Sequence, residues 1–349
     1  MISGDEPHAA FAPCPAGAHP VSRSSTPAGA TIPAQPAPRT RTAVRSLLRG
    51  AALRVPPVGR LLHQLAALGT ADPDTPQVWP PGHYYSPIPS LEDVTRYERQ
   101  IFSIPPYVPG VDLNGEAQLE QIERLGPATV HIPFGEESDP RYRYNFANEL
   151  FSYGDGVALF GMLRLLRPRR LMEIGSGFSS ALILDTNDLF LDGSMRCTFI
   201  EPHPERLFSL LRTADRTQVE IVERRLQDVD LDRFDALEAG DVLFIDSSHV
   251  SKAGSDVNRL MFEVLPRLRH GVVVHIHDIF YPFEYPREWI VQGRTWTESY
   301  LVHAFLQFNS EFRILLFNSY LAAVHRERVA SILPWWGRNP GGSLWLERI

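Results

Sequence analysis

One apolar stretch of the sequence leads into glycine and polar residues whose order suits a nucleoside cofactor. The segment RLMEIGSG contains Glu173, followed by Gly175, Ser176 and Gly177. Two glycines one residue apart allow a tight turn and close approach of a ligand, and a helix that begins after them offers free N–H groups to an anionic group. The next apolar segment, CTFIE, ends in Glu201, whose carboxylate is placed to accept hydrogen bonds from both hydroxyls of a ribose. The pattern predicts a nucleotide or nucleoside site.

Two further apolar segments end in groups that can carry protons. DVLFIDSSHV supplies Asp246 and then His249, and GVVVHIHD ends in His277 and Asp278. An imidazole titrates near neutral pH, so His249 is the first candidate for a general base. Lys252, the only lysine of the chain, is the second, because an amine loses its charge more readily than a guanidinium. Since strand side chains alternate, we expect His277 and Asp278 on opposite sides, with only one facing a substrate.

The glycine turn alone does not choose between cofactors. A turn followed by an acid at the end of the next strand is common to NAD and S-adenosylmethionine sites. The dinucleotide fingerprint has Gly or Ala where this chain has Ser180, and Glu173 is an unfavourable neighbour for a pyrophosphate but a favourable one for a cation. Both features disfavour NAD.

These residues need a scaffold that brings strand ends together. After Tyr144, apolar segments alternate with helical ones such as VALFGMLRLL, SSALILDTN and VNRLMFEVLPRL. Such alternation is typical of an α/β, doubly wound, Rossmann-like fold, whose mostly parallel sheet binds ligands beyond the carboxyl ends of its strands. Two last strands, FRILLFNSYLAAV and GGSLWLERI, predict an antiparallel C-terminal edge strand.

The first 143 residues have a different composition. Residues 1–41 are rich in Pro and Ala, and we expect a disordered extension. Residues 42–69 combine apolar residues at helical spacing with arginines and no acid, which predicts basic amphipathic helices lying on an anionic membrane surface or against the main domain. Residues 70–143, rich in Pro and aromatic residues, are expected to form an irregular cap, with a helix from Leu91 to Phe102 started by Ser90.

Composition excludes several classes of protein. The chain has 349 residues, 34 Lys and Arg against 41 Asp and Glu, a formal net charge of −7 and 44% hydrophobic residues. It can bury a sizeable core, and a globally basic nucleic-acid binder is disfavoured. No apolar run reaches the length of about 18 residues that a membrane span needs. Cys14 and Cys197 are too few for a disulfide scaffold or a Cys-based zinc site and suit a reducing compartment. We expect a cytoplasmic protein, held at the inner membrane face only if residues 42–69 bind lipid.

The segment E-I-G-S-G, followed by an acid at the end of the next strand, resembles the class I S-adenosylmethionine-dependent methyltransferase family. The resemblance covers residues 144–349, which we take as the catalytic domain, and implies S-adenosyl-L-methionine as the cofactor. It assigns the cofactor-binding residues as follows: Gly175, Ser176 and Gly177 at the methionine part with Glu173 beside them, Glu201 at the ribose, Asp228 at the adenine amino group, Asp246 at the methionine end and Tyr153 at the carboxylate. For Tyr153, packing is the alternative.

The last two strand ends resemble the catechol-type O-methyltransferases, in which two acids hold a magnesium ion. Asp246 and Asp278 fall at those positions, and carboxylates suit Mg²⁺. Ile279 stands where that family places Asn or Asp, so a metal-free site is the alternative. His249 matches the position of that family's lysine base.

Together these features predict a methyltransferase that acts on a hydroxyl of a small-molecule or sugar acceptor by in-line displacement. The candidate catalytic residues are His249, Asp246, Lys252 and His277. The aromatic segment from Tyr281 to Trp289 would either line the acceptor site or pack internally. Two alternatives remain, an NAD-dependent oxidoreductase and a non-catalytic cofactor-binding protein of the membrane surface. We expect no nucleic-acid partner, and the oligomeric state is left open.

Overall fold

The computed structural model describes residues 78–349, so the predictions for residues 1–41 and 42–69 lie outside the described part of the chain. The chain divides into two units, Met1–Val94 and Thr95–Ile349. In the described part of the first unit, a Pro-rich turn is closed by a hydrogen bond from the Gly82 N–H to the Ile88 carbonyl (3.0 Å). No helix within residues 78–349 is long and apolar enough to cross a membrane.

The helix predicted after Ser90 forms, but in two pieces. The Ser90 hydroxyl accepts a hydrogen bond from the Asp93 N–H (3.3 Å), as the N-cap prediction requires. Helix α3 (Leu91–Arg96) and helix α4 (Glu98–Ile101) are separated at Tyr97.

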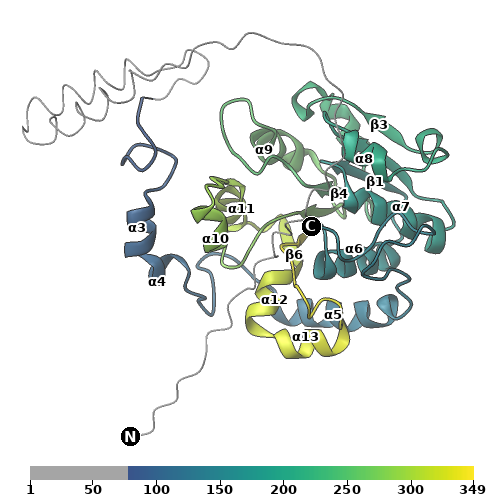
Figure 1. Cartoon of the computed structure of the whole chain (residues 1–349), viewed down its shortest axis with the longest axis horizontal. Helices are drawn as coiled ribbons and strands as arrows, with labels where there is room; N and C mark the ends of the chain where they lie inside the picture. Colours follow the sequence, from purple (N-terminus) through teal and green to yellow (C-terminus); the bar gives the residue numbers. More distant parts are fainter. Residues whose placement is uncertain (1–77) are drawn as a thin grey trace, which may run out of the picture. The chain divides into compact units, whose positions relative to one another are not determined.

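A seven-stranded sheet forms the centre of the second unit, in the order β3-β2-β1-β4-β5-β7-β6 (Figure 1). Its strands are β1 (Arg170–Ile174), β2 (Arg196–Ile200), β3 (Glu220–Val222), β4 (Val242–Ile245), β5 (Val273–Ile276), β6 (Phe312–Phe317) and β7 (Leu344–Arg348). All neighbours are parallel except for β7, which runs antiparallel to both β5 and β6. The α/β fold and the antiparallel C-terminal strand are confirmed, and this strand lies one place in from the edge.

The register places four strand ends at one level. Ile174, the last residue of β1, pairs with Ile200 of β2 and with Ile245 of β4, and Ile245 pairs with Ile276 of β5. All four residues of both β4 and β5 are buried, because helices cover both faces of a parallel sheet. The residues that follow these strands therefore meet at one edge, where the strand order reverses between β1 and β4.

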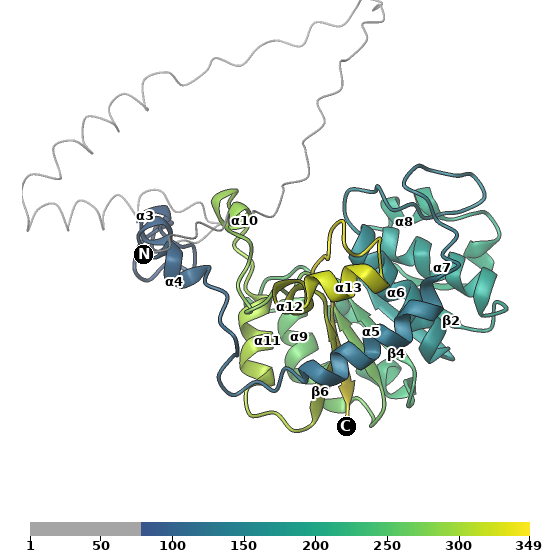
Figure 2. The same cartoon turned by 90° about the horizontal axis from the view of Figure 1, so that it is seen from below.

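Helices fill the connections between the strands. The α-helices of this unit beyond α4 are α5 (Gly115–Thr129), α6 (Tyr153–Leu166), α7 (Phe178–Phe190), α8 (Glu205–Leu210), α9 (Asp256–Arg259), α10 (Arg287–Val291), α11 (Glu298–Leu306), α12 (Asn318–Val324) and α13 (Arg326–Ile332). Short 3-10 turns are η1 (Asp215–Thr217), η2 (Leu226–Asp228), η3 (Leu231–Ala236) and η5 (Leu265–Arg267), and the π-helix η4 (Leu260–Val264) continues α9. Figure 2 shows α5 beside α6, and α11 contacts η4, the continuation of α9.

Helix α5 corrects the expectation of an irregular cap with little regular structure. The helix contains Gly115 at its start and Pro127 near its end, both poor helix formers, but Ile122 and Leu125 are buried and α5 packs on α6. A side chain at Gly161 of α6 would come within 2.6 Å of the Leu125 side chain, so this glycine allows the two helices to approach closely. Tertiary packing therefore overrides weak local propensity.

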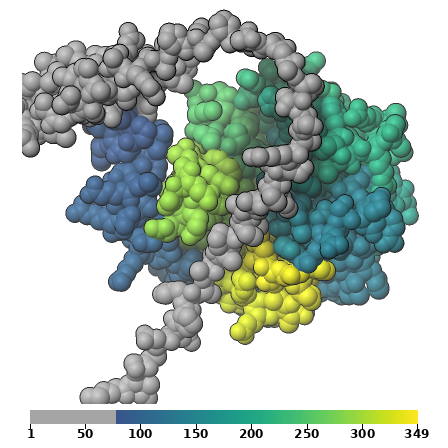
Figure 3. All heavy atoms as spheres, viewed as in Figure 1, coloured from purple at the N-terminus to yellow at the C-terminus, as the bar shows by residue number. Residues whose placement is uncertain are grey.

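A second correction concerns the segment FRILLFNSYLAAV, which we expected to be one strand. The strand β6 ends at Phe317, and Asn318 begins α12. Asn318 is buried and its side-chain amide donates to the Pro340 carbonyl (2.8 Å), which fixes the turn out of the sheet. A continuous apolar run does not distinguish a buried strand from a short buried helix. Figure 3 shows α12 and α13, in yellow, at the molecular surface.

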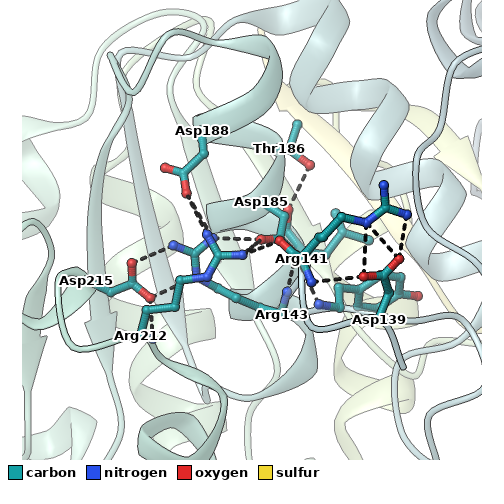
Figure 4. Close-up of polar contacts among 10 residues, drawn as sticks. Asp139, Arg141, Arg143, Asp185, Thr186, Asp188, Arg212 and Asp215 are labelled. Carbon is teal, nitrogen blue, oxygen red and sulfur yellow. Dashed lines mark hydrogen bonds and ion pairs between the residues drawn. The ribbon is translucent and has the colours of Figure 1, made fainter. Parts of the chain in front are cut away.

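A buried arginine joins the segment before α6 to the helices around the sheet. The Arg143 guanidinium, 3% exposed, contacts Asp185 of α7 (2.6 Å) and Asp215 of η1 (2.5 Å) (Figure 4). Asp188, more exposed, lies 2.9 Å from the same guanidinium. Asp185 also accepts a hydrogen bond from the Tyr144 N–H (3.0 Å). These contacts raise the pKa of Arg143 despite its burial.

Candidate active site

The glycine turn lies directly against the end of β4. Gly175 has φ +78°, and a Cβ at this position would lie 1.9 Å from the Asp246 carbonyl oxygen. Asp246 in turn donates its N–H to the Ile174 carbonyl (2.8 Å). Only glycine fits this left-handed turn and close approach, so the fold alone already demands Gly175. At Gly177, an added Cβ would lie 3.2 Å from the Arg206 side chain, which places a cation beside the turn.

Glu201 holds the glycine turn from the end of β2. One of its carboxylate oxygens accepts the Ser176 N–H (3.0 Å), and the other accepts the His203 N–H (2.8 Å). Each carboxylate oxygen has two lone pairs, so both keep capacity for a ligand hydroxyl. The Ser176 hydroxyl is buried and has no hydrogen-bond partner within residues 78–349. An acid with spare lone pairs beside a glycine turn fits a ribose-bearing cofactor.

Glu173 lies beneath the turn instead of facing a ligand. It is fully buried, and it accepts hydrogen bonds from the hydroxyls of Ser179 (2.6 Å) and Ser180. The Ser180 hydroxyl also accepts the Gly177 N–H (3.0 Å). Burial raises the pKa of Glu173 to about 8, although the hydroxyls of Ser179, Ser180 and Ser176 act in the opposite direction. Glu173, which we predicted at the cofactor, thus stabilises the start of α7. Ser180, which stands where the dinucleotide fingerprint has Gly or Ala, takes part in the same hydrogen bonds.

The pKa of Glu173 leads to a stability prediction. The folded carboxyl titrates near 8 and the unfolded one near 4.5, so the folded state binds the extra proton between these values. The extra stability that the protonated Glu173 carboxyl gives the folded state is complete below pH 4.5 and is lost as the pH rises through about 8. Relative to Glu173→Gln, we expect the wild-type free energy of unfolding to fall by up to about 1.4 kcal/mol per pH unit across this window. Urea unfolding of both proteins at several pH values measures this, and parallel curves would contradict it.

His249 lies at the centre of a cluster of acids. Its Nε2 is 3.2 Å from an oxygen of Asp246 and 3.8 Å from an oxygen of Asp278, and its Nδ1 is 2.8 Å from an oxygen of Glu298. Burial alone would lower the pKa of this imidazole, but hydrogen bonds to Asp246 and Glu298 raise it well above its usual value. Burial would likewise raise the pKa of Asp246, yet the charges of His277 and His249 bring it below its usual value.

The backbone at two of these residues is in the left-handed region. His249 has φ +59° and Asp278 has φ +57°. Non-glycine residues rarely adopt this conformation, and they keep it where the surrounding structure enforces it, often at functional sites. At Asp278 the turn also corrects the expectation from strand alternation. The strand β5 ends at Ile276, and an Asp278 oxygen lies 3.7 Å from His277 Nε2, so the two side chains are neighbours.

The geometry does not match the predicted magnesium site. Asp246 and Asp278 lie near each other as that prediction requires, but His249 Nε2 occupies the position between their carboxylates. Across residues 78–349, no group of three or more His, Cys, Asp or Glu side chains is arranged to hold a metal ion. The residues as placed do not fit the metal, and no step proposed below uses one. Magnesium dependence stays a prediction.

The remaining candidate residues lie away from His249. Lys252 is exposed, and only its backbone groups make hydrogen bonds in the described part of the chain. The Tyr153 hydroxyl donates to Glu136 (3.1 Å), and its ring stacks on Phe146 and Trp335, which favours the packing alternative. Asp228 is exposed beside a hollow of about 350 Å³ at the end of β3.

Most of the predicted aromatic wall packs internally. Tyr281, Phe283 and Tyr285 are each at most 5% exposed, and Phe283 stacks on His303. Nearer to His249 is Trp296, whose ring centroid lies 4.3 Å from that of the imidazole. Trp289 meets Trp296 edge to face at 5.2 Å. The yellow-green segment around α10, which carries Trp289, lies at the surface in Figure 3.

Sequence reasoning missed three residues of this cluster. Trp296 and Glu298 follow the aromatic segment, and Glu298 is the first residue of α11, in a stretch that reads as an ordinary helix start. Arg206 reads as one more surface arginine of α8, yet its charge contributes to the lowered pKa of Asp246. The sequence contains no local signal for any of the three, because each reaches the site through tertiary packing.

Comparison with known proteins gives a family match and a sequence relative. Residues 172–279 match a family model described as a methyltransferase domain. An uncharacterized protein of Archaeoglobus fulgidus is 35% identical over 177 residues, which are 48% of this chain and 78% of that protein.

Two solved structures illustrate the more distant likeness. A methyltransferase of Podospora anserina bound to S-adenosylhomocysteine shares 14% identity over 74% of this chain and 95% of its own, with a TM-score of 0.36. The O-methyltransferase TomG of Streptomyces achromogenes, involved in tomaymycin synthesis, shares 19% identity with this chain. The match covers 64% of this chain and 87% of TomG, with a TM-score of 0.33.

The strand order reverses beside a glycine turn, and one antiparallel strand is inserted near the end of the sheet. These features are typical of α/β proteins that bind a nucleoside cofactor. With the match over residues 172–279, the chain belongs to the class I S-adenosylmethionine-dependent methyltransferase family. It is therefore an S-adenosylmethionine-dependent methyltransferase, which replaces the oxidoreductase and non-catalytic alternatives.

Proposed function

We propose that this methyltransferase acts on a hydroxyl oxygen of a small-molecule or sugar acceptor, with His249 as the general base. The observation that supports this most is the placement of the His249 imidazole. It is buried, its Nδ1 is held by Glu298, and its Nε2 faces Asp246 at the edge where the glycine turn lies. A hydroxyl needs a base for methyl transfer because its proton must leave as the new bond forms.

The glycine-turn edge has groups suited to the cofactor. S-adenosylmethionine supplies a methyl group on a positively charged sulfur. Glu201 has lone pairs left for the ribose hydroxyls. Asp246, ionised through its lowered pKa, provides a negative charge at the methionine end. Asp228 at the adenine completes the proposed set.

Methyl transfer requires this chain to align the acceptor and to remove its proton. The acceptor oxygen must be held in line with the transferred methyl group, and the acceptor proton must pass to His249 Nε2. Trp296, half-buried beside the imidazole, and Trp289, which meets Trp296 edge to face, are the aromatic side chains that we expect near the acceptor, and Arg294 lies over both rings. Their bulk also limits access of water to the base.

Incubation of the full chain with methyl-labelled S-adenosylmethionine and an acceptor panel tests this function. The panel should contain phenols, sugars and secondary-metabolite alcohols, together with matched amines and thiols. We expect label on oxygen, with analogues whose hydroxyl is already methylated being inert. Transfer to amines or thiols alone would overturn the proposal while leaving the family unchanged.

Glu201→Ala tests the cofactor site separately. Losing the acceptor of ribose hydrogen bonds should weaken S-adenosylmethionine binding by about 1.5–3 kcal/mol, or about 10- to 150-fold in Kd. Isothermal titration calorimetry measures this, with Glu205→Ala, an exposed acid on the adjacent helix α8, as the matched control. Equal affinity of wild type and Glu201→Ala would remove Glu201 from the site.

A further inference from the structure

Glu298 contacts His249 through both its side chain and its backbone, and no sequence motif predicts this pair. Its side chain is 1% exposed, one carboxylate oxygen lies 2.8 Å from His249 Nδ1, and the other accepts the Ser247 hydroxyl (2.9 Å). The backbone N–H groups of Thr297 and Glu298 both donate to the His249 carbonyl, at 2.9 Å and 3.1 Å. The start of α11 therefore holds both the ring and the backbone of His249.

These contacts explain two unusual features of His249. Its left-handed backbone is held by the two hydrogen bonds to its carbonyl. Its ring orientation is held by Glu298 on one side and by the Trp296 ring on the other. A carboxylate at Nδ1 keeps a proton on that nitrogen, so Nε2 is the nitrogen that exchanges a proton with an acceptor. Nε2 is also the nitrogen that faces Asp246.

We propose that Glu298 is a positioning residue that orients His249 Nε2 toward the acceptor and keeps the proton on Nδ1. The arrangement resembles the acid–histidine pair of a catalytic triad, in which a buried acid orients the histidine base. Here the base would accept the proton of a methyl acceptor. The inference rests on the proposed role of His249 as the base. It does not depend on the chemical class of the acceptor.

A purely structural role for Glu298 is the competing explanation, and Asp256 offers a control for it. Asp256 also braces the loop after β4, since it accepts the Ser248 N–H (2.8 Å) and the Ser248 hydroxyl (2.5 Å). It makes no contact with the His249 ring in the described structure. Asp256→Ala should therefore loosen the loop without releasing the imidazole.

The experiment combines NMR of the imidazole with kinetics. In ¹⁵N-labelled full-length protein, wild type should give a downfield, slowly exchanging Nδ1–H resonance that His249→Ala removes. We expect Glu298→Ala to abolish the resonance and lower kcat at least about tenfold, with cofactor Kd and acceptor KM little changed. Glu298→Gln keeps an acceptor oxygen and should restore part of the resonance and of kcat. Asp256→Ala should keep the resonance.

The outcomes are separable. A protected Nδ1–H in folded Glu298→Ala, or loss of kcat that tracks thermal stability equally in Glu298→Ala and Asp256→Ala, would overturn the positioning role. If Glu298→Ala does not fold, the Glu298→Gln resonance decides the same question. Loss of the resonance with no O-methylation of any acceptor would refute the proposed function while leaving the Glu298–His249 orientation intact.

Discussion

His249→Ala is expected to lower kcat by about 10²- to 10⁴-fold, the usual contribution of a positioned general base. Cofactor affinity should be nearly unchanged, because the glycine turn and Glu201 are held by contacts that do not involve His249. Steady-state kinetics with the identified acceptor and calorimetry with S-adenosylmethionine measure the two effects. His270→Ala, an exposed histidine, is the control.

The same residue sets the expected pH dependence. Asp246, Asp278, Glu298 and the nearby His277 surround the imidazole, and the net effect is a pKa well above the usual value. Below that pKa the ring is protonated and cannot accept a proton, so wild-type kcat/KM should rise as the pH increases through it. The rise should be absent in His249→Ala. Unaffected turnover in this variant would move the base role to Lys252 or His277.

Arg143→Ala is expected to destabilise the protein by about 3–5 kcal/mol, because it removes the one buried cation that pairs with both buried carboxylates in the described part of the chain. Asp185 and Asp215 are 2% and 4% exposed, and both bond to the Arg143 guanidinium. The variant also removes the side-chain hydrogen bonds that join the segment before α6 to α7 and η1 (Figure 4), whereas the backbone N–H groups of residues 143 and 144 still bond to Asp185. Urea unfolding followed by circular dichroism gives the difference in free energy of unfolding.

Arg141→Ala is the matched control for Arg143→Ala. Arg141 pairs with Asp139 two residues away, and its side chain is 74% exposed. An exposed pair contributes little to stability, so this variant should unfold nearly as wild type does. Equal losses in the two variants would show that the buried network stabilises the fold no more than a surface pair.

The sequence determined the features whose residues are close together along the chain. The turn Glu173–Gly177 and the acid Glu201 lie at the ends of consecutive strands, and polar groups after β4 and β5 predicted the same edge. Because parallel strands share one direction, their carboxyl ends must meet, and local patterns alone identified the residues there. The family resemblance rested on the same short segments.

Only the tertiary structure decided which side chains of these residues contact one another. Glu173 belongs to the edge by sequence, but burial turns it toward Ser179 and Ser180. Helix α5 forms despite Gly115 and Pro127, since burial against α6 outweighs propensity.

The strongest contacts join residues far apart in sequence. Glu298 follows His249 by 49 positions, and Arg143 bonds to Asp185 and Asp215 across 42 and 72 positions. No periodicity or motif encodes such pairs, because their distances depend on how helices pack on the sheet. The sequence therefore indicated the class of enzyme and the edge at which we propose that the cofactor binds, while packing decided which acid contacts His249 and which ion pairs join the helices around the sheet.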